Sequence, residues 1–92
     1  MKLEIVPSKQ FRKDVRLAIK RGKNLTALDI VVTCLTAMNP LPQKYRDHSL
    51  TGRYIGFREC HIEPDWLSIY RIEDEKLLLI LFRTGSHSDL FK

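Results

Sequence analysis

The chain has 92 residues, which is enough for one small domain with a single hydrophobic core. Apolar residues make up 43% and charged residues 29%, and the longest apolar run, residues 77–82, is far shorter than the ~20 residues needed to cross a bilayer. Because the first residues are also too few and too charged for a secretion signal, these features exclude a membrane protein and predict a cytoplasmic one.

Positive charge is concentrated near the N-terminus. The net charge is +5, and residues 1–23 hold eight Lys or Arg against Glu4 and Asp14, which gives a local charge of +6. A basic segment of this kind favours contact with nucleic acid or with an acidic protein. The same pattern is also typical of a solvated helix face, so charge alone does not decide between these interpretations.

The first elements expected along the chain are a short strand and a helix. Residues 3–6 alternate weakly before Pro7 and indicate a strand. Ser8 can cap a helix over residues 9–21, whose apolar side chains recur on one face while basic residues occupy the rest. Gly22 fits the left-handed position that commonly follows a helix.

A second helix and a long loop follow. Asn24 or Thr26 can cap this helix, and Asn39-Pro40 ends it. Residues 40–56 show no hydrophobic period and contain prolines and glycines, which predicts a long surface loop. Loops of this length in small domains are usually functional or mobile, and this one contains His48.

The C-terminal half predicts three strands joined by tight turns, over residues 57–62, 66–72 and 77–82. The last of these is apolar on both faces, which indicates a central, covered strand. The order β-α-α-β-β-β predicts an α+β fold, a single domain over residues 1–92. Its two helices should pack on one face of a mainly antiparallel sheet.

All three histidines lie outside the two predicted helices, in the C-terminal half. His61 ends one strand and Asp65 precedes the next, so a tight turn should bring them close together. Arg83 and His87 leave the following strand, which should pair antiparallel beside that turn. Hairpin topology therefore places these four residues at one edge of the sheet, which His48 can reach from its loop.

Such a set of groups could cleave RNA without a metal. A base takes the proton from the ribose 2′-OH, a cation stabilises the phosphorane, and an acid protonates the leaving 5′-oxygen. Arg83 suits the cationic role, whereas Asp65 could either polarise a histidine or act as an acid with a raised pKa. Cys34 and Cys60 are expected to be free thiols, and no Cys-x-x-Cys or His-Glu-x-x-His spacing supports a zinc site.

Several of these residues also have ordinary structural interpretations. Trp66, Tyr70 and Phe91 could offer surfaces on which bases stack, but Trp66 and Tyr70 alternate along a strand, which is more typical of a core. Any single histidine in a strand-rich domain is more often structural or solvated. The convergence of several groups on one edge favours an active site.

Three stretches of the chain resemble the YafQ branch of the RelE-type bacterial toxins. They read YRDHSLTG over residues 45–52, GFRECHIEPDW over 56–66 and RTGSHSDLF over 83–91, and the likeness extends over essentially the whole chain. The resemblance implies a RelE-like fold and a ribosome-dependent endoribonuclease that cuts translated mRNA by 2′-OH attack. It also implies that no metal or other cofactor is used.

The resemblance further assigns roles to single residues. It makes His48, His61, Asp65 and His87 acid–base residues, gives Arg83 the phosphate, and places Phe91 near the substrate. We expect Trp66 and Arg58, which lie in the same stretches, to contact the substrate as well. We favour His87 or Asp65 as the acid and His48 or His61 as the base. The resemblance also implies inhibition by a cognate antitoxin and contact with DNA only through the antitoxin complex.

Two other functions fit the same predicted fold. A ParE-type toxin inhibits gyrase by binding, and such a protein has no need for three proton-transfer groups. A non-catalytic RNA-binding or interaction module would depend on the basic N-terminal helix and not on the histidines.

Overall fold

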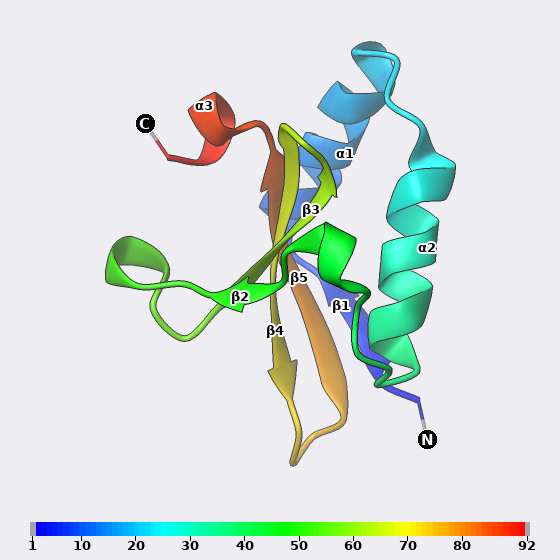
Figure 1. Cartoon of the computed structure of the whole chain (residues 1–92), viewed down its shortest axis with the longest axis vertical. Coiled ribbons are helices and arrows are strands. Elements are labelled where there is room, and N and C mark those ends of the chain that lie inside the picture. Colours follow the sequence, from blue (N-terminus) through cyan, green and yellow to red (C-terminus); the bar gives the residue numbers. More distant parts are fainter. Residues whose placement is uncertain (1, 92) are drawn as a thin grey trace.

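The computed structural model describes residues 2–91 (Figure 1). The helices and strands are β1 (Glu4–Pro7), α1 (Lys9–Lys20), α2 (Leu25–Thr36), β2 (His48–Ser49), β3 (Arg58–Glu63), β4 (Trp66–Glu73), β5 (Leu78–Gly85) and α3 (His87–Leu90). Two single-turn 3₁₀ helices, η1 (Gln43–Tyr45) and η2 (Gly52–Tyr54), flank β2. No helix within residues 2–91 has the length and apolar character needed to span a membrane.

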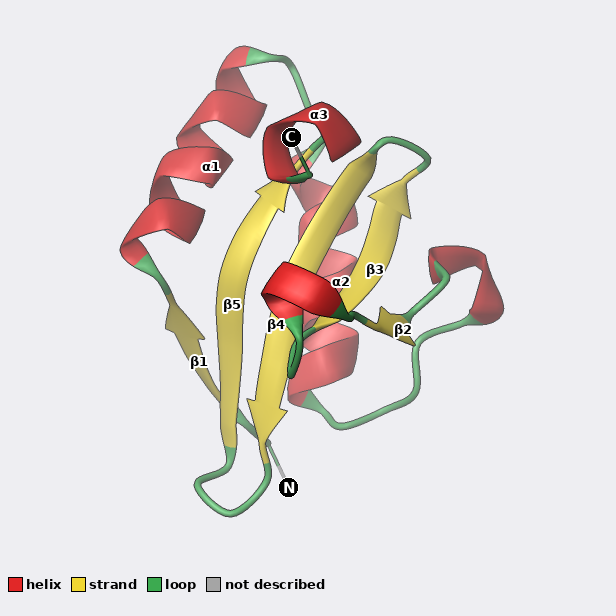
Figure 2. Cartoon of the chain, turned by 90° about the vertical axis from the view of Figure 1, so that its left-hand side faces the viewer, coloured by secondary structure: helices red, strands yellow, loops and turns green. Residues whose placement is uncertain are grey.

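The strands form one sheet in the order β1-β5-β4-β3-β2 (Figure 2). Strands β2 to β5 pair antiparallel with their neighbours, and β1 lies parallel to β5 at the other edge. In this register Leu67 of β4 pairs with His61 of β3 on one side and with Gly85 of β5 on the other. The end of β3 therefore lies close to the point where β5 leads into α3.

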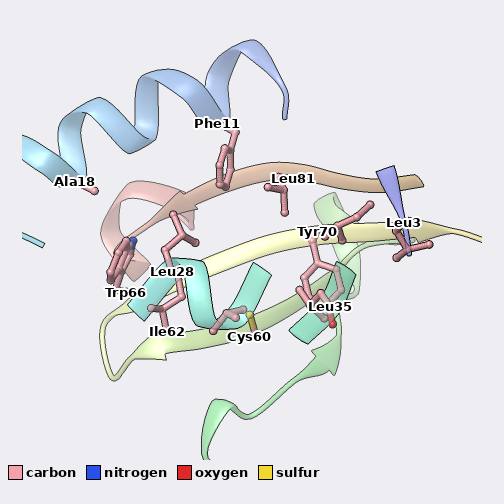
Figure 3. Close-up of a cluster of buried hydrophobic side chains, with 12 residues drawn as sticks. Leu3, Phe11, Ala18, Leu28, Leu35, Cys60, Ile62, Trp66, Tyr70 and Leu81 are labelled. Atoms are coloured by element: carbon pink, nitrogen blue, oxygen red, sulfur yellow. The ribbon is translucent and has the colours of Figure 1, made fainter. Parts of the chain in front are cut away.

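The helices α1 and α2 cover one face of the sheet and enclose the main core (Figures 1 and 3). Ser8 caps α1, because its Oγ accepts a hydrogen bond from the Phe11 N–H at 2.9 Å. Phe11, Asp14 and Ala18 recur every three or four residues and are buried, which turns the basic side chains of α1 outward. The buried residues of α2 are Leu28, Val31 and Leu35.

A smaller apolar cluster lies on the opposite face, where Figure 2 shows α3 on the far side of the sheet from α2. Tyr54 of η2 and Leu90 of α3 pack there against Leu67 and Ile69 of β4. The Tyr54 hydroxyl donates a hydrogen bond to the Leu90 carbonyl oxygen at 2.9 Å. This bond ties the loop before β3 to the C-terminal helix.

The predicted α+β architecture, with two helices on one face of a mainly antiparallel sheet, is confirmed. Asn24, and not Thr26, is the N-cap of α2. The predicted loop over 40–56 contains β2 and both 3₁₀ turns, and β5 continues to Gly85 because β4 keeps pairing with its polar end. The four-residue helix α3 is too short to produce a hydrophobic period, so the sequence did not predict it.

Leu79→Ala should lower the free energy of unfolding by about 2–5 kcal/mol, because this side chain of β5 is fully buried and its loss leaves a cavity. Leu17→Ala is the matched control, since Leu17 is 41% exposed and its loss should cost less than about 1 kcal/mol. Denaturant unfolding followed by circular dichroism measures both values. Similar losses in the two variants would contradict the assigned core.

Candidate active site

Three histidine rings form a row at one end of the sheet. The ring centroids of His48 and His61 lie 6.3 Å apart, and those of His61 and His87 lie 5.8 Å apart. The ring of Phe91 extends the row, with its centroid 6.2 Å from that of His87. The structure therefore brings together the three histidines that the sequence singled out.

The strand register explains why these rings meet. Cross-strand partners share a face of the sheet, and His61 pairs with Leu67, which belongs to the cluster on the α3 side. His48 pairs with Glu59, which lies two residues before His61 on β3 and therefore points to that same face. His87 arrives from the end of β5, which pairs with the other side of Leu67.

Asp65 holds His87 through two hydrogen bonds. Its Oδ1 accepts the His87 backbone N–H at 3.0 Å and lies 2.9 Å from His87 Nδ1. These bonds, the backbone one foremost, lower the pKa of Asp65 below its usual value, so the group is ionised at neutral pH. A carboxylate can only accept, so Nδ1 carries a proton and Nε2 is left for chemistry. Asp65 is therefore suited to orienting His87 and not to donating a proton itself.

Asp89 fixes the short helix that carries His87. Its Oδ2 accepts hydrogen bonds from the Ser86 N–H at 2.9 Å and from Arg21 Nη1 at 2.7 Å. Ser86 Oγ in turn accepts the Asp89 N–H at 3.1 Å, which completes a capping box. Gly85 permits Asp89 to pack closely against the end of β5, since a Cβ at residue 85 would lie only 2.9 Å from the Cβ of Asp89.

A buried carboxylate that the sequence analysis missed lies between two of the histidines. Glu59 is 4% exposed, and its Oε1 lies 3.5 Å from the Nε2 atoms of both His48 and His61. Its Oε2 is buried and has no hydrogen-bond partner within residues 2–91. Positive charge on either imidazole would offset the cost of burying this carboxylate. The sequence could have revealed Glu59 through its spacing, because a residue two positions before His61 on a strand points to the same face as His61.

Arg83 is held by a carboxylate from α1. Its Nε and Nη2 donate to Asp14 at 2.8 and 3.2 Å, and Asp14 also accepts the Thr84 N–H at 3.1 Å. The bond to Asp14 is the main cause that raises the pKa of Arg83, and Tyr54 adds to it. Tyr54 lies 5.4 Å from Phe91 between ring centroids. Within the described chain no hydrogen bond or ion pair joins Arg83 to a histidine. Arg83 is connected to His87 through neighbouring aromatic rings, since Tyr54 lies beside Arg83 and contacts Phe91, and Phe91 contacts His87.

Trp66 and Arg58, which the sequence predicted to contact the substrate, lie away from the histidine row. Trp66 is 1% exposed and packs in the main core beside the helices, as does Tyr70 (Figure 3). Arg58 pairs with Tyr70 and so points to the helical face, where its Nε and Nη2 each lie 3.3 Å from an oxygen of Asp47. One side chain is buried and the other lies on the face opposite to the histidine row.

The assembled groups define what the site can do chemically. The imidazoles are groups that can accept and donate protons, two carboxylates contact them, and Arg83 supplies a permanent cation for an anionic substrate. Among residues 2–91, no three or more His, Cys, Asp and Glu side chains are arranged to hold a metal ion.

Comparisons with known proteins identify the family to which this chain is similar. Residues 3–92 match the family described as "Bacterial toxin of type II toxin-antitoxin system, YafQ". The mRNA interferase toxin YafQ of Escherichia coli K12 is 45% identical over 89 residues, which cover 96% of this chain and 95% of the relative. A chain in the crystal structure of the E. coli DinJ–YafQ toxin–antitoxin complex has a TM-score of 0.90 at 43% identity, with both chains covered completely. A metal-bound toxin from Helicobacter pylori has a TM-score of 0.91 at 46% identity, covering 97% and 99% of the two chains.

These findings place the protein among the toxins of bacterial type II toxin–antitoxin systems. Within that class, the chain belongs to the YafQ family. The family resemblance drawn from its sequence motifs is confirmed.

Asp89→Ala should destabilise the protein by about 1 kcal/mol at neutral pH, because the capping box of α3 is lost. The bonds from Arg21 and then Ser86 hold the pKa of Asp89 well below its usual range. Its contribution is therefore complete above the pKa of an unfolded Asp, ~4, and is lost as pH falls through the lower folded value.

Unfolding of the parent and of Asp89→Ala, followed at neutral and acidic pH, measures this dependence. The stability difference between the two proteins should shrink in acid. Ser88→Ala serves as the control, since Ser88 is an exposed residue of the same short helix and outside its capping box. A difference that stayed constant or grew toward acidic pH would contradict the role given to the Asp89 carboxylate.

Proposed function

We propose that this chain is an endoribonuclease that cleaves mRNA during translation on the ribosome, by attack of a ribose 2′-OH on the adjacent phosphodiester. The observation that carries this proposal is the row of His48, His61 and His87, with the Asp65 carboxylate bound to the last of them. The name of the E. coli relative, an mRNA interferase, supports the same activity. One imidazole acts as base and another as acid, each contributing ~10²–10⁴-fold to the rate.

His87 is the general acid in this proposal. Asp65 occupies its Nδ1, which leaves Nε2 to give a proton to the departing 5′-oxygen. The lowered pKa of Asp65 keeps this carboxylate ionised at neutral pH, so Asp65 itself has no proton to donate. Of the two acids considered from the sequence, His87 is thus the one that this geometry supports.

The general base is His48 or His61. His48 Nδ1 lies 2.7 Å from the Arg46 carbonyl oxygen, which can only accept, so the proton of the neutral ring is on Nδ1 and the lone pair is on Nε2. The exposed fraction of the side chain is 50% for His48 and 13% for His61, so His48 is the more accessible to a 2′-OH. Glu59 contacts both rings, since its Oε1 lies 3.5 Å from the Nε2 atom of each.

Arg83 binds the reacting phosphate and Phe91 flanks the substrate in this scheme. The Asp14 carboxylate keeps the Arg83 guanidinium in a fixed orientation, which lowers the entropic cost of using it for binding. The ring of Phe91, 42% exposed, stands beside His87 and can take a stacked base.

The exposed face of α1 supports contact with ribosomal RNA. It carries a stripe of five basic side chains, and the only acidic residue of this helix, Asp14, is buried against Arg83. An uninterrupted positive surface attracts phosphates and makes binding dependent on salt. The basic residues of this stripe are Lys9, Arg12, Lys13, Arg16 and Lys20.

We also propose that a cognate antitoxin inhibits this chain. The E. coli relative has been crystallised with the antitoxin DinJ, which supports an equivalent partner here. An acidic antitoxin segment would match the same basic surface and compete with RNA for it. Contact with DNA would then occur only through the antitoxin complex.

His87→Gln should abolish cleavage of mRNA on programmed ribosomes while leaving the fold intact. Gln cannot supply a proton at neutral pH, yet it approximates the size of the ring and can still donate to Asp65. Primer extension maps the cleaved ends, and circular dichroism checks the fold. Lys76→Ala, in the turn between β4 and β5, is a control that should cut normally. Cleavage by His87→Gln at the parental rate would count decisively against the proposal.

Replacing Arg12, Lys13 and Arg16 of α1 by Ala should weaken binding to ribosomes and make it less sensitive to salt. Each lost phosphate contact should reduce the slope of log K against log salt by about one. Sedimentation of labelled protein with ribosomes at several salt concentrations gives this slope. An unchanged slope in the triple variant would show that α1 is not part of the RNA-binding surface.

A further inference from the structure

A groove borders the site at Tyr54 and Arg83, on the same side of the sheet as the histidine row. It has a volume of about 560 Å³, within the ~300–1,000 Å³ common for ligand sites. We call it the aromatic groove, because its floor consists of Tyr54, Phe57 and Phe82. Among the described residues that line it, the charged ones are all cations, namely Lys9, Arg53 and Arg83.

The floor of the aromatic groove offers flat apolar surface. Phe57 and Phe82 stack with their centroids 4.5 Å apart and their planes 24° apart. Tyr54 meets Phe82 edge-on at 6.2 Å. Phe57 and Phe82 are only partly buried, although they pack in the cluster around Leu67 and Ile69. Each ring covers a face of the other, and Cζ of Arg71 lies 5.0 Å from the Phe57 centroid, so a planar group can use only the ring surface that these contacts leave open.

The cations around the floor keep donors that the protein does not use. Both hydrogen bonds of Arg53 come from Nη2, to the Tyr54 hydroxyl at 2.9 Å and to the Leu90 carbonyl at 3.0 Å. Its Nε and Nη1 make no hydrogen bond within residues 2–91. Lys9 is exposed at the start of α1. The groove thus combines an aromatic floor with positive charge at its rim.

This combination matches single-stranded nucleic acid, whose bases stack on aromatic rings while its phosphates bind cations. An acidic peptide would satisfy the cations but would gain little from the stacked rings. The groove is also continuous with the proposed active site, because Tyr54 contacts Phe91 and Phe91 contacts His87. Its position suits a nucleotide next to the one that is cut.

We propose that the aromatic groove is a substrate subsite that binds one nucleotide of the message beside the scissile phosphate. The base packs against the outer surface of the stacked Phe57–Phe82 pair, and the phosphate contacts Arg53 and Lys9. This inference rests on the proposed ribonuclease function and deepens it. Because every base has a flat face, the subsite contributes affinity and little base selectivity.

Phe57→Leu and Phe82→Leu test the subsite, since each removes a ring but keeps an apolar side chain. In single-turnover cleavage on programmed ribosomes, each variant should need about tenfold more protein to reach half the maximal rate. The maximal rate itself should change by less than about twofold, because the proton-transfer groups are untouched. Lys9→Ala should act in the same direction without altering the floor, with Lys76→Ala as its matched control. Parental half-saturation in all three variants would overturn the subsite.

A titration that needs no cleavage separates this inference from the proposed function. A trinucleotide with 2′-O-methyl riboses, which cannot be cut, should shift the ring-proton NMR signals of Phe57 and Phe82 in the full chain. The same trinucleotide without bases should leave them in place. Base-dependent shifts would support the subsite even if the chain failed to cut mRNA. Equal shifts from both probes, or shifts caused only by an acidic peptide, would overturn the subsite even if cleavage were observed.

Discussion

The arrangement of the proposed active site depends on the hydrogen bonds from His87 to Asp65. These bonds connect the turn after β3 with the start of α3. Asp65 follows β3, His87 begins α3, and both side chains are more than half exposed. An exposed pair of this kind contributes little to stability by itself. Its geometry is therefore maintained by its surroundings, in which Asp89 caps the helix and Gly85 permits the close approach of α3 to the strand.

The same design recurs across the site, because each functional base or cation lies against a carboxylate, which in every case but His61 comes from another part of the fold. Such pairing fixes the orientation of the cationic group and leaves one side of it for the substrate. The outer face of α1 follows the opposite rule, since its basic side chains have no acidic neighbour on the helix and remain available for a polyanion. The pairs within the site are Asp65 with His87, Glu59 with His48 and His61, and Asp14 with Arg83.

The parts of this arrangement that tight turns determine could be predicted from the sequence. The parts that depend on packing between distant segments could not. Tight turns force β3, β4 and β5 to be neighbours, so the meeting of His61 and His87 could be predicted from the sequence alone. The role of Asp14 could not, because its partner is 69 residues away and the docking of α1 on β5 brings them together. Arg58 was misplaced for a simpler reason. Adjacent strand residues point to opposite faces, so Arg58 and Glu59 cannot both face the histidines.

The central claim is that Asp65 fixes the protonation geometry of His87, and the ¹H–¹⁵N spectrum of the imidazole tests it most directly. The account predicts that the neutral ring carries its proton on Nδ1, and that Asp65→Ala shifts the ring toward the Nε2–H form. A neutral His87 that already carries its proton on Nε2 in the parent protein would contradict it.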